Sequence, residues 1–508
     1  MSKTITVTTA EGKSYQFVDD GSPMQGGMKD VYFAPDKSYV VAFFRDKQDF
    51  NSKERLNNIV KNFRERIFNQ AGGEYWKELF CWPYDMLEHN GQVGIVVPVY
   101  QKHFFFQTGY NPQGNAIASI KGKEKEGKWF ASPQFRNKQF KLHLDKTELG
   151  DWAKYFSVCI KISRAVRRMH AAGLAHSDLS YKNVLIDPVT GMAAIIDIDG
   201  LVVPGKFPPD VIGTPDFIAP EVMASKHLGK TDKDRKLPSI QTDRHALAVM
   251  IYMYLLYRHP LRGGKIHDTD PQKDEELGMG AKALFVEHPT DKSNRPKLNQ
   301  VKPTHLPWAD VDKIPYKIVG PYLKELFDKA FIEGLQNPNV RPTADDWETA
   351  LVKTVDLMQP CQNPSCEQKW YVFADTTKPK CPFCGTEYKG QLPILNLYSK
   401  SPKGQFSFEN RRLMVYSGQN IYQWHVNKNL TPNEKLQPSQ KKPVADFHFI
   451  NNKWILINRS LTSMIDKDVP DNDTPVEIGK SIDITDGKKI LLSKEEGGRL
   501  IIVQLVNN

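Results

Sequence analysis

An ordered set of short motifs in the middle of the chain restricts what this sequence can fold into. HSDLSYKN, residues 176–183, places Asp178 five residues before Asn183, and Asp197 in IIDIDG follows fourteen residues after Asn183. The motifs GTPDFIAPE, TDRHALAVMIY and VRPTADDW come next, in that order. An isolated aspartate is usually a solvated loop carboxylate, but chance does not explain this order and spacing. A carboxylate can take a proton from a hydroxyl group, and carboxylate and amide oxygens suit Mg²⁺, so these side chains predict one metal-assisted catalytic site.

These motifs resemble those of the eukaryotic-type protein kinase superfamily. The resemblance covers roughly residues 15–355 and implies a bilobal fold that binds ATP between its lobes. It also implies that Asp178 is the catalytic base and that Asn183 and Asp197 bind Mg²⁺ or Mn²⁺ next to the phosphates. In this family GTPDFIAPE forms the platform for a polypeptide, so the resemblance implies a protein substrate and opposes a small-molecule kinase.

Further polar residues have roles that the resemblance implies or leaves open. It implies that Glu221 pairs with Arg341 in a buried structural ion pair and that Asp243 anchors the catalytic loop from the apolar helix. Asp199 stands where the family has the glycine of its DFG motif. It is either a second metal ligand or a residue of the turn before Gly200, and we favour the turn.

The lysine that most of these kinases carry in a VAIK motif is missing. The chain reads VAFF there and ends on Phe44. Arg45 follows directly, but successive strand residues point to opposite faces, so Arg45 should face away from the cleft. Alignment of MQGGMKDVY on the glycine-rich loop places Gly26 and Gly27 in the loop and Lys29 on the returning strand, where the segment resembles the with-no-lysine kinases. We therefore predict that Lys29 binds the ATP phosphates, against the alternative of a surface lysine.

A partner for Lys29 is expected on the helical stretch LNNIVKNFRERIF. Glu65 in this stretch lies 21 residues after Phe44, near the family spacing. We predict that Glu65 is the partner, with Glu54 as the second choice. For both, the alternative is an exposed helical glutamate.

Four of the six cysteines fall within one short stretch of the chain. Cys361 and Cys366 have four residues between them, and Cys381 and Cys384 have two. This spacing suits a tetrahedral site of four thiolates, and Gly385 suits the tight turn after the second pair. Four sulfur ligands leave no open position for catalysis, so we predict a structural Zn²⁺ ribbon.

Beyond residue 392 the sequence reads as short strands such as RLMVY, KWILIN and GRLIIVQLV, separated by turn residues. The last stretch, PVEIGKSIDITDGKKILLSKEEGGRLIIVQLV, resembles the final strands of forkhead-associated domains, which read phosphothreonine. We do not find the GR and SxxH signatures of that family, so a phosphopeptide reader and an inert β-sandwich both stay open. Together with ALFVEHPTDKSNRP, the architecture resembles kinases of bacterial tellurite-resistance gene triads. This resemblance implies a PP2C-type phosphatase and a von Willebrand A-type protein as partners.

The composition is that of a soluble globular chain, with 25% charged and 40% hydrophobic residues. The formal net charge of +10 could suggest a nucleic-acid partner. The basic residues are dispersed, however, so we expect no nucleic acid. The N-terminus lacks the apolar core of a signal peptide, and the longest apolar run, residues 248–257, is too short to span a bilayer. We therefore expect a cytoplasmic protein with no membrane partner.

The fold class that follows is α+β, a bilobal protein-kinase fold followed by a zinc ribbon and a small all-β domain. The predicted kinase N-lobe covers residues 1–98 and the C-lobe residues 99–358. The zinc ribbon covers residues 359–390, and the all-β module, which resembles forkhead-associated domains, covers residues 391–508.

The leading functional prediction is a kinase that transfers the γ-phosphate of ATP to Ser or Thr of protein substrates in bacterial stress signalling. The alternative is a pseudokinase scaffold that binds nucleotide or partner proteins without transfer. The altered VAFF and DID motifs favour the scaffold, whereas Asp178, Asn183 and Asp197 favour the enzyme. Ser180 replaces the lysine that Ser/Thr kinases carry two residues after the catalytic aspartate, and Lys182 stands where some tyrosine kinases have a basic residue.

The segment between the metal site and GTPDFIAPE predicts an unusual mode of regulation. LVVPGKFPPDVIG, residues 201–213, contains no Ser, Thr or Tyr. Ser177 replaces the arginine that would receive a loop phosphate in the family. Three prolines restrict the backbone of this segment. We therefore expect a loop that is not a phosphorylation switch.

Overall fold

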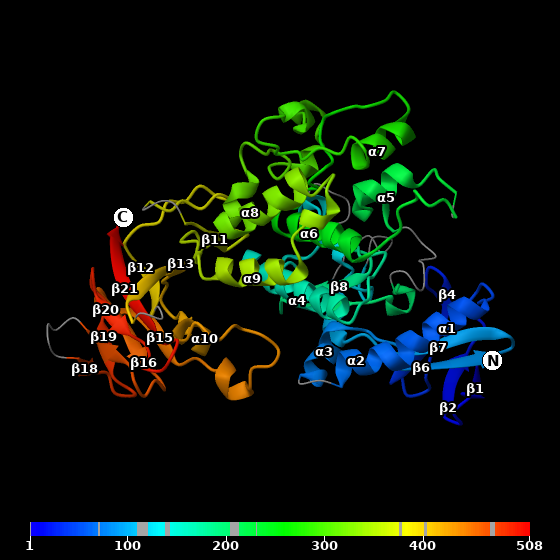
Figure 1. Ribbon diagram of the computed structural model, residues 1–508, viewed down its shortest axis with the longest axis horizontal. Coiled ribbons are helices and arrows are strands. Elements are labelled where there is room, and N and C mark those ends of the chain that lie inside the picture. Colours follow the sequence, from blue (N-terminus) through cyan, green and yellow to red (C-terminus); the bar gives the residue numbers. More distant parts are fainter. Residues whose placement is uncertain are drawn as a thin grey trace. The chain divides into compact units, whose positions relative to one another are not determined.

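The computed structural model describes residues 2–69, 72–108, 120–137, 143–203, 213–229, 231–374, 378–400, 404–467 and 473–508. The chain divides into two compact units, and Figure 1 colours it from the N-terminus to the C-terminus. The first unit consists of Met1–Gly150, Lys154–Tyr316 and Glu325–Glu348, and the second of Asp151–Ala153, Lys317–Lys324 and Thr349–Asn508. The four domains expected from the sequence are a finer division than these two units and stay a prediction.

A five-stranded antiparallel sheet forms the N-terminal part of the first unit, with strand order β3-β4-β5-β7-β6. Its strands are β3 (Met24–Gln25), β4 (Lys29–Phe33), β5 (Tyr39–Phe44), β6 (Asp85–His89) and β7 (Gln92–Pro98). A separate hairpin of β1 (Lys3–Thr8) and β2 (Ser14–Asp19) precedes this sheet.

The sequence of β5 is apolar because other residues pack on both faces of this sheet. Phe43 packs against Phe17 of the β1-β2 hairpin. Phe44 packs on the opposite face, in a cluster with Leu56. Because alternate residues of a strand point to opposite faces, a strand covered on both sides is apolar at every position. Position 44 therefore faces the helical side of the sheet.

The helical segment of this N-terminal part is interrupted by a π-helical turn. Its elements are α1 (Phe50–Asn58), the π-helical turn η1 (Ile59–Phe63), α2 (Arg64–Phe68) and α3 (Gly73–Leu79). The Asp49 side chain accepts a hydrogen bond from the backbone N–H of Ser52, which explains the start of α1. A π-helical turn closes i→i+5 hydrogen bonds, so the side chains beyond it are rotated relative to an unbroken α-helix.

The chain that follows is mainly helical. Its helices are α4 (Trp152–Ala171), α5 (Pro220–Ser225), α6 (Ile240–Leu256), α7 (Pro271–Met279), α8 (Pro321–Asp328) and α9 (Ala344–Val355). Between α4 and α5 lies a hairpin of β8 (Val184–Asp187) and β9 (Met192–Ile195). The apolar run of the sequence lies in α6, where every residue from Ala246 to Leu256 is buried. A helix that is apolar on all sides belongs in a core.

Two packed β-sheets make up most of the second unit. Their strand orders are β13-β12-β21-β20-β17-β18 and β14-β15-β16-β19. Leu395 and Ile501 of the first sheet share one buried core with Phe447 and Leu456 of the second, so the predicted all-β module is a β-sandwich. Its elements are β12 (Gln391–Lys400), β13 (Phe406–Met414), β14 (Asn420–Ile421), α10 (Gln423–Val426), β15 (Ala445–Ile450), β16 (Lys453–Asn458), β17 (Ile465–Asp466), β18 (Thr474–Pro475), β19 (Ser481–Asp483), β20 (Lys489–Leu491) and β21 (Arg499–Asn507).

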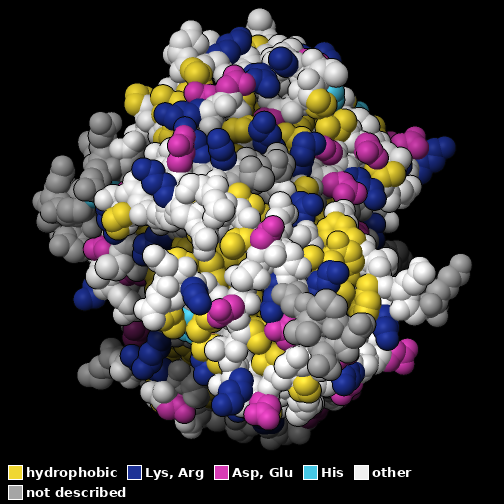
Figure 2. Space-filling model, turned by 90° about the vertical axis from the view of Figure 1, so that its left-hand side faces the viewer, with side chains coloured by type: hydrophobic (Ala, Val, Ile, Leu, Met, Phe, Trp, Pro, Cys, Tyr) yellow, Lys and Arg dark blue, Asp and Glu magenta, His cyan; other side chains and the backbone are white. Residues whose placement is uncertain are grey.

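The charged side chains on the face drawn in Figure 2 are of both signs and lie interspersed. Apolar side chains are scattered between them on this face. Of the helices that the structure describes, none has both the length and the apolar character needed to cross a membrane.

Candidate active site

A cavity of about 710 Å³ lies in the first unit, between the five-stranded sheet and the β8-β9 region. A volume of this size accommodates a small-molecule ligand. Val31, Ala42 and Ile95 line the apolar part of the cavity. The polar part is lined by residues that the sequence motifs single out: Gly26, Gly27, Lys29, Asp178, Asn183, Asp197 and Asp199.

The Asp178 carboxylate accepts three hydrogen bonds from two residues on two segments of chain. Its Oδ1 accepts from the backbone N–H of Thr214 at 2.6 Å and from the Thr214 hydroxyl at 2.8 Å. Asn183 donates through Nδ2 to Asp178 Oδ2 at 3.0 Å and to the Asp178 carbonyl at 2.8 Å. Such contacts fix the side chain in one rotamer, so the carboxylate is positioned before any ligand binds.

The loop that carries Asp178 is anchored from beneath by Asp243 of α6, as the resemblance implies. Asp243 Oδ2 accepts from the backbone N–H of His176 at 2.7 Å and lies 3.1 Å from His170 Nε2. Ser177 and Asp197 have left-handed backbone conformations, with φ of 65° and 59°. Left-handed conformations are unfavourable for these residue types and persist only where neighbouring contacts impose them.

The predicted pair of Glu221 and Arg341 is also present. Arg341 Nη1 and Nη2 donate to the two carboxylate oxygens of Glu221 at 2.9 and 2.7 Å. Arg341 is only 2% exposed, so this two-point ion pair ties the GTPDFIAPE segment to the loop before α9. Residues 204–212, which contain the three prolines of the predicted regulatory loop, lie outside the described residues.

Lys29 and Phe44 are directly opposed on the neighbouring strands β4 and β5. Directly opposed residues of an antiparallel pair project from the same face of the sheet. The Lys29 Nζ atom accordingly lies 5.3 Å from the centroid of the Phe44 ring. A lysine at position 29 therefore reaches the region that a lysine at position 44 would reach.

The Lys29 ammonium contacts two carboxylates in the cavity. Its Nζ lies 3.0 Å from Asp197 Oδ1 and 2.7 and 2.6 Å from the two carboxylate oxygens of Asp199. Burial by itself would lower the Lys29 pKa, but the charges of Asp199 and Asp197 outweigh burial, and the pKa is raised above its usual value. Partial loss of water around the Asp197 carboxylate opposes its ionisation, yet the Lys29 charge lowers the Asp197 pKa. The contacts with the two carboxylates thus favour the charged form of Lys29.

Asp199 is the cavity residue whose surroundings the sequence failed to predict. It lies in the 3₁₀ turn η7 (Ile198–Gly200), so the expectation of a turn is correct for its backbone. Its side chain, however, is 9% exposed and makes the two shortest contacts of Lys29. The sequence did contain a signal for this contact, because the DFG-like motif has a second acid and the VAIK lysine is absent.

The predicted pairing of Lys29 with Glu65 is wrong. Glu65 is exposed and is not among the residues that line the cavity. The prediction counted residues from Phe44, but Glu65 lies in α2, at least ten residues beyond the α1 residues that reach the cavity. Ser52 and Arg55 of α1 line the cavity instead, and Arg55 is buried.

Arg45 lies outside the cavity lining, as the strand alternation predicts. Its guanidinium donates to the backbone carbonyls of Gly26, Gly27 at 3.3 Å and Lys29 at 3.2 Å. Arg45 Nε also bonds Asp30 Oδ1 at 3.0 Å. These contacts hold the glycine-containing turn against the start of β4, so Arg45 orders the loop from its outer side.

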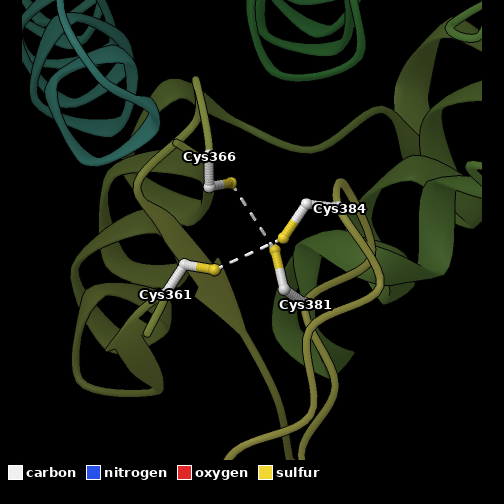
Figure 3. Close-up of side chains that lie close together, drawn as sticks. All are labelled: Cys361, Cys366, Cys381 and Cys384. Carbon is white, nitrogen blue, oxygen red and sulfur yellow. Dashed lines mark hydrogen bonds between the residues drawn. The ribbon is translucent and has the colours of Figure 1, made fainter. Parts of the chain in front are cut away.

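The four clustered cysteines converge in the second unit, beside the pair of β10 (Met358–Pro360) and β11 (Trp370–Val372) (Figure 3). All four Sγ atoms lie within 4.8 Å of one another. Cys361 Sγ and Cys384 Sγ are 3.5 Å apart, and Cys366 Sγ and Cys381 Sγ are 3.9 Å apart. Four thiolates around one Zn²⁺ would be about 3.8 Å apart, given Zn–S bonds of about 2.3 Å. The donor set and its spacing fit a tetrahedral zinc site.

A family model described as the protein kinase domain matches residues 125–348. This segment is a protein kinase domain. The matched range includes Asp178, Asn183 and Asp197, whereas Lys29 lies in front of it, so the assignment of Lys29 depends on the geometry given above.

The kinase domain has curated relatives at low identity. The serine/threonine-protein kinase PknD of Chlamydia abortus is 25% identical over 272 residues, which are 48% of this chain and 24% of the relative. The cell cycle serine/threonine-protein kinase CDC5/MSD2 of Saccharomyces cerevisiae is 28% identical over 232 residues, which are 39% of this chain and 31% of the relative. The chain thus spans 24% to 31% of the length of these two relatives.

Among solved structures, the kinase domain of a Toxoplasma gondii rhoptry antigen aligns with 56% of this chain and 84% of its own chain. The aligned residues are 15% identical, and the TM-score is 0.34.

Proposed function

We propose that this protein is an ATP- and Mg²⁺-dependent protein kinase that phosphorylates Ser or Thr of protein substrates. The observation that supports the proposal most is the convergence of Lys29, Asp178, Asn183 and Asp197 on one cavity inside a unit that contains a protein kinase domain. The retained acids and the charged Lys29 favour an enzyme over the pseudokinase scaffold.

The chain's own residues divide the reaction between them. Asp178 accepts the proton of the attacking hydroxyl group. The oxygen of that hydroxyl group bonds to the γ-phosphorus, and the bond from the γ-phosphorus to the ADP oxygen breaks. Lys29 stabilises the phosphate charge from β4, and the turn of Gly26 and Gly27 lies beside the phosphates. Asn183 and Asp197 are the residues that would hold Mg²⁺, which neutralises charge on the phosphates.

We propose that Asp199 is the counter-ion that positions Lys29, the role that the sequence assigned to Glu65. An ammonium group has three donors, so Lys29 can remain on Asp199 while it bonds a phosphate. Asp197 contacts Lys29 through Oδ1, but its exposed carboxylate stays accessible to the metal. A lysine on β4 is also the placement that the resemblance to the with-no-lysine kinases implies.

Transfer of labelled phosphate tests the proposed function. The purified protein, incubated with γ-labelled ATP and Mg²⁺, should label itself or a mixture of Ser- and Thr-containing peptides. Asp178→Asn, which keeps the shape and removes the base, should reduce labelling by about 100-fold or more. A wild-type protein that binds ATP but transfers no more phosphate than Asp178→Asn would establish the scaffold instead. Phosphoamino-acid analysis that gives mainly phosphotyrosine would refute the acceptor class.

We further propose that the cysteine cluster binds one structural Zn²⁺. We propose too, on the resemblances given above, that the chain works in the cytoplasm in bacterial stress signalling with a PP2C-type phosphatase and a von Willebrand A-type protein. The β-sandwich of the second unit is compatible with the forkhead-associated-like module. Co-purification of the full chain with these two proteins tests the partners, and failure of both to bind would refute them.

A further inference from the structure

The first unit contains a second cavity, of about 730 Å³, that plays no part in the reaction as described. One wall includes the 3₁₀ turn η5 (Pro133–Arg136) and the end of α6. The other walls come from the catalytic loop, through Tyr181 and Lys182, and from the segment 296–309. We call this space the side cavity.

Part of the side cavity's lining comes from the loop that carries the catalytic carboxylate. Tyr181 and Lys182 line the side cavity and stand between Asp178 and Asn183 in the sequence. The Tyr181 hydroxyl donates to Asp216 Oδ2 at 3.1 Å. Asp216 comes two residues after Thr214, whose backbone and hydroxyl hold Asp178. A polypeptide with its hydroxyl at Asp178 would therefore have neighbouring residues beside this wall.

Basic side chains dominate the lining of the side cavity. Asp216 is the only acid among the described lining residues, and it already bonds Tyr181 and Arg262, the latter at 2.6 Å through Nε. Two other cations have carboxylate partners outside the lining: Arg258 pairs with Glu287 and Lys128 with Glu126.

Three exposed lysines of the lining are not neutralised. Lys182, Lys297 and Lys302 make no ion pair within the part of the chain that the structure describes. His305 adds a buried Nε2 atom that has no hydrogen-bond partner among the described residues. The side cavity thus offers three free positive charges and one unused polar nitrogen, which an anionic ligand would satisfy.

We propose that the side cavity binds an acidic stretch of the protein substrate next to the phosphorylated Ser or Thr. The occupant is a polypeptide because the cavity shares its wall with the loop that carries the catalytic carboxylate. It is acidic because the unpaired lysines leave the cavity with positive charge. The proposal rests on the proposed kinase activity and adds a substrate class to it.

Peptide phosphorylation kinetics test the substrate class. Three serine peptides of equal length carry glutamate, glutamine or lysine beside the acceptor. The wild type should phosphorylate the glutamate peptide with a kcat/KM about tenfold above the glutamine peptide, a preference typical of two or three exposed charge pairs. The preference should fall as salt is added. Equal rates for all three peptides would overturn the proposal.

A charge-reversed variant shows whether this cavity causes the preference. Lys297→Glu/Lys302→Glu should favour the lysine peptide over the glutamate peptide. Lys292→Glu/Lys313→Glu, which reverses two exposed lysines outside the lining, should keep the wild-type preference. The proposal is refuted if both double variants behave alike. A peptide with phosphoserine in place of glutamate separates the two sources of negative charge, and use of either one above the glutamine peptide supports an anion-binding site.

A binding measurement separates failure of this proposal from failure of the kinase activity. Fluorescence anisotropy of the labelled glutamate peptide with Asp178→Asn protein measures binding of the peptide without phosphate transfer. Binding that is lost in the Lys297→Glu/Lys302→Glu background supports the side cavity even if the wild type transfers no phosphate. Absence of binding in a protein that does phosphorylate peptides overturns the side cavity alone. Competition by a single-stranded oligonucleotide at lower concentration than by the peptide would assign the cavity to nucleic acid and refute the proposal.

Discussion

The ammonium group of Lys29 depends on Asp199 for its position, because Asp199 makes its two shortest contacts and is nearly buried. Asp197 makes the longer contact, and its side chain is 57% exposed. Asp199 therefore supports the lysine, whereas Asp197 is open to a ligand. The pair of Lys29 and Glu65 expected from the sequence is thus replaced by a pair of Lys29 and Asp199.

Asp199→Asn should lower kcat/KM for ATP by about 10- to 100-fold, the usual effect of losing a partner that orients an active-site group. Glu65→Gln is the matched control, since it makes the same chemical change at an exposed position, and it should have no effect. Steady-state kinetics with varied ATP compare the two variants. A loss of activity in Glu65→Gln with normal activity in Asp199→Asn would restore the prediction from the sequence.

At the scale of elements, the cysteine cluster makes a prediction about the second unit. The full chain should contain one equivalent of zinc, and Cys381→Ser should remove it and lower the unfolding temperature of the second unit, because thiolate ligation contributes directly to folding. Metal analysis and thermal unfolding measure both effects. Cys159→Ser, at a buried cysteine of α4 outside the cluster, should keep the metal. A wild-type protein that is free of metal and as stable as Cys381→Ser would contradict the site.

Some parts of the site could be predicted from the sequence because they lie within one short motif, and others could not. The catalytic loop was predictable because Asp178 and Asn183 act within one short motif whose spacing is nearly independent of the surrounding fold. Lys29 could be proposed from the loss at position 44, but its role depends on the β4-β5 register, which a single sequence does not specify. Glu65 was misassigned because counting from Phe44 selects a position in α2, whereas the helical residues that line the cavity lie in α1.

At the scale of the whole molecule, motif and pattern predicted a kinase and a β-rich tail; a protein kinase domain matches residues 125–348, and the strands of the tail are present. Strand alternation indicated the tail as all-β, but the order of its strands comes from pairings far apart in the sequence, such as β12 with β21. Short motifs do not encode such pairings. The side cavity was missed for the same reason, since its lysines come from segments more than a hundred residues apart.

We propose that one cavity transfers phosphate with a lysine supplied from β4. The most direct measurement is the rate of phosphate transfer by the wild type, Lys29→Met, Arg45→Met and the double variant Lys29→Met/Phe44→Lys. Lys29→Met should lose about 100-fold or more in kcat, since the charge on the phosphates is no longer stabilised. Arg45→Met should lose less than about tenfold, because Arg45 orders the loop from outside the cavity.

In the double variant the lysine is moved to the directly opposed position on β5, which projects from the same face of the sheet. We expect Lys29→Met/Phe44→Lys to be at least about tenfold more active than Lys29→Met, with circular dichroism confirming that all variants are folded. Full activity in Lys29→Met, or a greater loss in Arg45→Met than in Lys29→Met, would contradict the proposal.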